Sequence, residues 1–186
     1  EALVENHHDL PDVLSSMGGP VVMKVIGPVH KSDVGGVILN IRDVDYAMSS
    51  YKKLMSIPEA TIVLVQQMLE GQELFAGIKY EKKFGHILLC GMGGIFIEVL
   101  KDFSASLTPL SKAEADEMIR NLRIYPMLKG IRGQKGINLK LFADILVRLS
   151  NLVSSFPQIM ELDLNPLMAS GDKIYAVDAR IRIGHT

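Results

Sequence analysis

Three oxygen-bearing side chains alternate along one stretch near the end of the chain, and a fourth follows them. Glu161, Asp163 and Asn165 are spaced two residues apart, so in a β-strand they share one face. After a turn at residues 170–172 the chain returns through a second alternating run that contains Asp178. If the hairpin closes over that turn, Asp178 lies near Asp163 and Asn165. Carboxylate and amide oxygens suit Mg²⁺, which takes few protein ligands and completes its shell with water and phosphate oxygens.

The spacing alone leaves two interpretations of this hairpin open. One is a Mg²⁺ site, and the other is a strand pair with one polar, solvated face, which is common in half-buried antiparallel sheets. The elements that would have to position these residues therefore decide between the two interpretations.

Composition narrows the class of protein. The chain has 186 residues, of which 48% are hydrophobic and 22% charged, with a formal net charge of -1. This is the composition of a globular protein, and it gives no electrostatic reason to expect nucleic acid or an anionic membrane as a partner. The single cysteine, Cys90, excludes an internal disulfide and fits a reducing compartment, so we expect a cytoplasmic protein. The opening EALVENHHDL resembles the middle of a helix, so we expect a piece of a longer protein.

The predicted elements are grouped rather than regularly alternating. Strands are predicted at residues 21–26, 37–41, 61–68, 73–80 and 86–90, followed by the terminal hairpin. Helices are predicted at 43–55, from the Ser111 capping box, and from Asn138 to Pro157, with weak helical patterning over 1–16 and a Gly-rich connection over 125–133. This grouping favours an α+β protein with two lobes, 1–68 and 69–186, over a doubly wound parallel sheet.

Three further features could carry chemistry. Lys24 lies in a nearly apolar strand, where its ammonium must reach solvent, pair with a carboxylate or meet an anion. His30 lies in a polar loop and is either a surface histidine or a reactive one. The run from Gly91 to Gly94 could present N–H groups to phosphate or be a plain glycine turn. No P-loop, zinc-ligand spacing or nucleophile elbow is present in the sequence.

Five strings occur in a fixed order: VVMKVIGPVHKSDVGGV, LVQQMLEGQELFAGIKY, FGHILLCGMGGIFIEVLKD, YPMLKGIRG and ELDLNPL…AVDAR. Together they resemble the ATP-grasp domain of ADP-forming acyl-CoA synthetases, relatives of the succinyl-CoA synthetase β chain, from about residue 17 to the end. The resemblance implies an α+β ATP-grasp fold, in which two lobes hold ATP or ADP with Mg²⁺ between them. The N-terminal helix and first strands of that family would be missing here.

The resemblance also implies roles for individual residues. Lys24 matches a lysine that reaches the nucleotide phosphates, and Asn165 and Asp178 match the Mg²⁺ ligands. His30 matches a loop histidine that carries a phosphoryl group, and Asp163 matches an acidic residue beside the phosphohistidine. The remaining matches surround the nucleotide, at the hinge and just after it: Gln66, Gln67, Met68, Leu69 and Glu73. Relatives often carry glutamate where this chain has Gln66 and Gln67, and their loop between Lys24 and His30 is longer.

The implied reaction is acyl-CoA + ADP + phosphate ⇌ carboxylic acid + CoA + ATP, in which this domain exchanges a phosphoryl group between ATP or ADP and a histidine. Such a ligase needs a CoA-binding subunit, or further domains of the same polypeptide, because no string here resembles a CoA site. The alternative is a non-catalytic regulatory module of the kind found fused to protein acetyltransferases.

Overall fold

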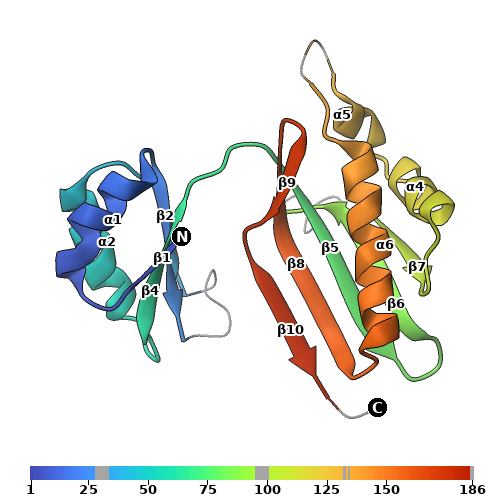
Figure 1. Ribbon diagram of the computed structural model, residues 1–186, viewed down its shortest axis with the longest axis horizontal. Helices are drawn as coiled ribbons and strands as arrows, with labels where there is room; N and C mark the ends of the chain where they lie inside the picture. The colour runs from blue at the N-terminus through green and yellow to red at the C-terminus, as the bar shows by residue number, and fades with distance from the viewer. Residues whose placement is uncertain (28–33, 95–100, 132, 134, 185–186) are drawn as a thin grey trace. The chain divides into compact units, whose positions relative to one another are not determined.

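The computed structural model describes residues 1–27, 34–94, 101–131, 133 and 135–184. The chain divides into two compact units, Glu1–Leu69 and Glu70–Thr186, which we describe one at a time (Figure 1). Every strand pairing among the described residues is antiparallel. Antiparallel strands with separately grouped helices confirm the predicted α+β class.

The first unit is a four-stranded sheet with helices packed on one face. Its strands lie in the order β1 (Ala2–Val4), β4 (Ile62–Gln67), β2 (Val21–Ile26) and β3 (Val37–Ile41). The helical elements are the 3-10 helix η1 (His7–Asp9), α1 (Leu10–Met17) and α2 (Val44–Met55). The core joins alternate residues of β2 and β4 to these helices, and includes Met23, Val25, Val63, Val65, Leu10 and Leu54.

The start of the chain differs from the helix that the sequence predicts. Ala2–Val4 forms an edge strand, because Ala2 pairs with Val65 and Val4 with Val63 on β4. Pro11, which the pattern treats as a helix breaker, lies in the first turn of α1. The N–H that proline lacks has no intrahelical acceptor in that turn, so a proline there favours the helix start.

The second unit is a six-stranded sheet with helices on one face. The strands lie in the order β10 (Ala179–Ile183), β8 (Ile159–Ser170), β5 (Gln72–Glu81), β6 (Gly85–Met92) and β7 (Phe103–Leu107), and β9 (Lys173–Ala176) also pairs with β8. Figure 1 shows α6 (Leu139–Ser155) lying along the sheet, with α4 (Lys112–Arg120) and α5 (Tyr125–Lys129) beside it. The core between sheet and helices includes Leu74, Ile78, Leu88, Phe142, Leu146 and Leu162.

Local capping signals correctly predicted three helix starts. The Asp43 side chain accepts the Tyr46 N–H at 2.7 Å, and the Asn138 side chain accepts the Leu141 N–H at 3.0 Å. Ser111 and Glu114 form the complete capping box. No described helix is long and apolar enough to cross a lipid bilayer.

Two elements of the second unit were not predicted. The Gly-rich connection contains a short helix, α5, with Pro126 in its first turn. Strand β7 was missed, although Phe103, Ala105 and Leu107 alternate with two serines, because a short strand is stabilised by its neighbour β6 rather than by its own residues.

The sheet of the second unit has two chemically different faces. Core residues of β5, β6 and β8 point toward α4 and α6, and the residues between them point the opposite way. We call this opposite side the outer face. One row across it runs through Arg180, Asp163, Gly77, Leu89 and Ala105, and the next through Arg182, Glu161, Lys79, Ile87 and Leu107.

A buried carboxylate ties β7 to the segment that follows α4. Asp102, which is 7% exposed, accepts the N–H of Arg123 at 3.0 Å and that of Ile124 at 2.9 Å. The Ile124 N–H would otherwise be buried without an acceptor, which is costly, and the Arg123 N–H is partly buried. Asp102 therefore fixes the turn between α4 and α5 against the sheet.

We predict that Asp102→Ala lowers the free energy of unfolding by about 2 kcal/mol, because two backbone N–H groups lose their acceptor. Asp102→Asn keeps one acceptor and should lose less. Urea denaturation followed by circular dichroism measures both changes. A midpoint for Asp102→Ala equal to that of the wild type would show that the two bonds contribute nothing.

Candidate functional site

In the terminal hairpin, β8 pairs with β9 and with β10 in the same register, although the returning strand is interrupted between β9 and β10. Leu167 pairs with Ala176 on β9, and Leu164 pairs with Ala179 on β10. Counting inward from both pairs places Asn165 opposite Asp178. Residues 177 and 178 lie between β9 and β10, so this position of Asp178 follows from the register on either side, and it is the position that the two predicted metal ligands require.

A bulge in the ladder lies at the same place. On β5, Leu74 pairs with Leu167 and Ala76 pairs with Leu164, so two β8 residues, Asn165 and Pro166, oppose the single residue Phe75. The Asn165–Pro166 peptide bond is cis. The expectation that Pro166 limits further ladder pairing is wrong, because β8 continues to Ser170 and residues 167–170 pair with β9. Bulges re-aim side chains and are common beside functional sites.

Glycines on the neighbouring strands make room for the oxygen atoms of this cluster. A Cβ on Gly93 would lie 3.2 Å from Oδ1 of Asn165, and one on Gly94 would overlap Oε2 of Glu73. Gly77 pairs with Asp163, and a Cβ there would lie 3.7 Å from its Oδ1. Glu73 and Asn165 therefore both lie beside the chain segment 93–94.

We call Glu161, Asp163, Asp178 and Glu73 the acidic cluster, and the pKa of Asp163 is shifted. Its partial burial raises the pKa of the Asp163 carboxyl, and the charges of Glu161 and Asp178 raise it further, whereas Arg180 opposes them. Arg180 lies directly opposite Asp163 in the ladder. Arg182 is paired with Glu161 at 3.2 Å, so Asp163 and Asp178 are left with Arg180 as the basic residue whose charge acts on Asp163.

This donor set fits a magnesium ion bound mostly by phosphate. Asn165 offers an amide oxygen and Asp178 a carboxylate, which are hard ligands. Among the described residues no group of three or more His, Cys, Asp or Glu side chains could enclose a metal. Two protein ligands are the number that the sequence predicts for Mg²⁺ brought in by a nucleotide.

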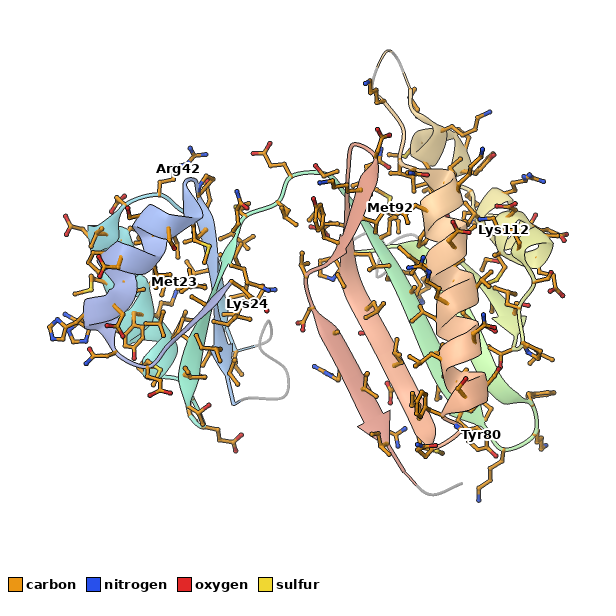
Figure 2. All side chains as sticks on the ribbon, in the orientation of Figure 1. Met23, Lys24, Arg42, Tyr80, Met92 and Lys112 are labelled. Carbon is orange, nitrogen blue, oxygen red and sulfur yellow. The ribbon has the colours of Figure 1, made fainter. Side chains whose placement is uncertain are left out.

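The first unit carries the predicted lysine on the sheet face away from α1 and α2. Met23 belongs to the core, and its neighbour Lys24 points to the other side of β2 (Figure 2). Lys24 is 8% exposed and pairs in register with Val37 and Leu64. Gln66 on β4 lies on the same face, because it pairs with Val22 two residues before Lys24.

The predicted hinge residues are the last two residues of β4, Gln66 and Gln67, and the two that follow it, Met68 and Leu69. The side-chain amide of Gln66 donates to Oε2 of Glu1 at 2.7 Å, and Gln67 is exposed. The Met68 N–H donates to the Pro20 carbonyl at 2.8 Å, and Leu69 ends the first unit. His30 lies outside the described residues.

Sequence reasoning missed the structural part that the glycines play. The Gly93 N–H donates to the Glu73 carbonyl at 2.8 Å, so it continues the pairing of β5 with β6 beyond Met92. Alternation places Arg180 on the same face as Asp178, but the sequence did not indicate its effect on Asp163, which depends on the pairing of β10 with β8.

Comparison with known proteins identifies relatives of the whole chain. The family model described as the ATP-grasp domain matches residues 1–183. The acetate–CoA ligase I (ADP-forming) of Archaeoglobus fulgidus is 40% identical over 191 residues, which cover 98% of this chain and 28% of the ligase. The β subunit of the corresponding enzyme I of Pyrococcus furiosus is 38% identical, covering 96% of this chain and 82% of that subunit. The chain thus spans little more than a quarter of the A. fulgidus protein.

A solved structure shares the fold. The dinucleotide-forming acetyl-coenzyme A synthetase 1 of Ca. Korarchaeum cryptofilum superimposes with a TM-score of 0.80 and 34% identity, covering 97% of this chain and 85% of that one. That protein is in complex with coenzyme A and Mg-AMPPCP, with its phosphohistidine segment pointing towards the nucleotide binding site.

We predict that Asp163→Asn stabilises the protein at neutral pH when Mg²⁺ and nucleotide are absent. Because the pKa of Asp163 is raised, the folded protein favours the protonated carboxyl and penalises the carboxylate. The stability that this group contributes is therefore full below the ordinary pKa of an aspartate and is lost as the pH rises through the raised pKa. Urea midpoints measured across this range should separate the variant from the wild type at neutral pH and converge in acid.

The exposed turn residue Asp172 supplies the control, since Asp172→Asn should leave the midpoint unchanged at every pH. An Asp163→Asn midpoint at or below that of the wild type at neutral pH would contradict the electrostatic account of the cluster.

Proposed function

The chain belongs to the ATP-grasp domain family, in the branch found in ADP-forming acetyl-CoA synthetases, and from this premise we propose that it is the nucleotide-binding part of such an enzyme. It exchanges a phosphoryl group between ATP or ADP and a histidine. The complete enzyme catalyses acyl-CoA + ADP + phosphate ⇌ carboxylic acid + CoA + ATP.

One observation carries this proposal above the others: the hairpin register that sets Asn165 opposite Asp178 beside Gly93. A cluster with so few protein ligands suits a metal that arrives with phosphate oxygens. The K. cryptofilum relative is in complex with Mg-AMPPCP, which supports the same ligand for this chain.

Phosphoryl transfer asks a protein mainly to position its reactants and to neutralise charge. Mg²⁺, when bound, would neutralise charge on the phosphate groups. Asn165 and Asp178 would hold it, and Lys24 would add a positive charge at the phosphates. Glu73 and the segment Gln66–Leu69 surround the rest of the nucleotide.

The acceptor side of the reaction is a histidine. In the ATP-forming direction the phosphorus–nitrogen bond of a phosphohistidine breaks, and a new bond forms to a terminal oxygen of ADP. We assign His30 the part of a second carrier, a neutral imidazole that receives the phosphoryl group before the nucleotide does. Asp163 lies beside the phosphohistidine during this exchange.

The remaining chemistry requires a partner. The chain spans about a quarter of the A. fulgidus ligase and most of the P. furiosus β subunit. We therefore propose that a CoA-binding part with its own phosphohistidine, either a separate subunit or further domains of the same polypeptide, completes the enzyme. The ligase names of these relatives favour an enzyme over the regulatory alternative.

We predict that Asp178→Ala weakens binding of ADP in the presence of Mg²⁺ about 5- to 150-fold, because loss of one charged contact costs about 1–3 kcal/mol. Calorimetric titration with and without Mg²⁺ measures the affinity. Asp172→Ala, in the turn of the same hairpin, is the matched control and should bind as the wild type does. If the wild type binds ADP equally well with and without Mg²⁺, the metal assignment is wrong.

We predict that His30→Asn abolishes phosphoryl exchange between ATP and ADP in the complete enzyme while nucleotide affinity stays within about twofold of the wild type. Asparagine keeps a polar side chain of similar reach but has no nitrogen that can accept the phosphoryl group. Exchange is followed with labelled ADP. Exchange that survives within a few-fold would show that the partner's histidine reaches the nucleotide without His30.

A further inference from the structure

The outer face of the second unit carries an apolar area beside the candidate site. It consists of side chains from β6 and β7, which we call the apolar strip: Ile87, Leu89, Phe103, Ala105 and Leu107. In register, Ile87 pairs with Leu107 and Leu89 with Ala105. These residues alternate with core residues such as Leu88 and Cys90, so they point away from α4 and α6.

The strip is exposed although it is apolar. Phe103 is 51% exposed and Leu107 53% exposed, and none of the five residues is charged. The other half of the same face is polar, with Arg182 bonded to Glu161 at 3.2 Å and Arg180 opposite Asp163. A contiguous exposed apolar area bordered by charged residues is typical of an interaction surface.

The strip is continuous with the candidate site. Gly91 pairs with Phe103 on one side and with Phe75 on the other, and Phe75 is the residue that faces the Asn165–Pro166 bulge. The Phe75 ring lies against Gly91, where a Cβ would be 2.7 Å from it, so an apolar side chain rather than a charged one lies between the strip and the bulge. Three strand spacings separate β7 from β8, which is about 15 Å.

We propose that the apolar strip is the docking surface for the CoA-binding part that brings its phosphohistidine to Asn165 and Asp178. This inference rests on the proposed function. A polypeptide segment that delivers a histidine to this cluster has to approach along a surface that adjoins it. About three quarters of the A. fulgidus ligase lies outside the part that matches this chain, so the partner is large enough to cover the strip.

The apolar chemistry of the strip also favours this occupant. The charged half of the outer face adjoins the phosphate groups and the metal, where the phosphohistidine arrives. A hydrophobic contact on β6 and β7, two and three strand spacings from β8, holds the segment without competing for those charges, because apolar burial is non-directional and needs no charged partner.

The test uses the complete enzyme and the double variant Phe103→Thr, Leu107→Thr. Threonine retains a high preference for β-strands while removing most of the apolar surface, so β7 should persist. We measure Mg-ADP affinity, the rate at which labelled ATP phosphorylates the partner's histidine, and phosphohistidine formation from acyl-CoA and phosphate. Labelling by ATP should fall about tenfold or more, as for loss of central apolar contacts, while the other two measurements stay within about twofold.

Ile183→Thr is the matched control. Ile183 is also an exposed apolar residue, 69% exposed, but it lies on the opposite edge strand, β10, and pairs with the core residue Ile159 rather than with the outer-face residues. It should leave all three measurements unchanged. Labelling of the double variant within about twofold of the wild type would overturn the docking proposal. So would sedimentation showing that the variant changes the number of copies of this chain while labelling persists, since the strip would then join two copies. A wild-type enzyme whose histidine is never labelled by ATP would instead overturn the proposed function, and the docking proposal with it.

Discussion

The register of β8 is the constraint on which the second unit depends. This strand bonds to β5 along one edge and to β9 and β10 along the other. A slip by one residue would turn Leu162 out of the core and Asp163 into it, because side chains alternate with period two. Burying a leucine is worth about 1.5–3 kcal/mol, so the core side chains of this one strand hold the polar side chains of its other face in place.

The candidate site lies where that regular ladder is interrupted. The bulge at Asn165 and Pro166 gives β8 one more residue than β5 has to oppose it, which changes the direction of the side chains locally. Glycines at 93 and 94 then let Asn165 and Glu73 approach the backbone closely. The space that Cβ atoms would fill at these two glycines is taken by the oxygen atoms of Asn165 and Glu73.

The electrostatics of the cluster follow from the same geometry. Asp163 is held with its pKa raised by partial burial and by neighbouring carboxylates, and Arg180 only partly compensates. A protein selected for stability alone would separate these charges. Their retention on one face is consistent with a cation and phosphate groups that complete the charge balance, and the neighbouring apolar strip provides a different kind of contact on the same face.

The sequence by itself determined the local part of this structure. The starts of α2, α4 and α6 follow from capping residues, and the polar face of β8 follows from alternation, because those effects act over a few residues. Alternation also singled out Asn165 and Asp178 as candidate oxygen ligands. Tertiary structure decided the rest. Ala2–Val4 and β7 are strands because β4 and β6 offer them hydrogen bonds. Gly93 lies close to Asn165 because both β6 and β8 pair with β5. Pairing of distant segments is selected by burial over the whole sheet, which no local pattern records.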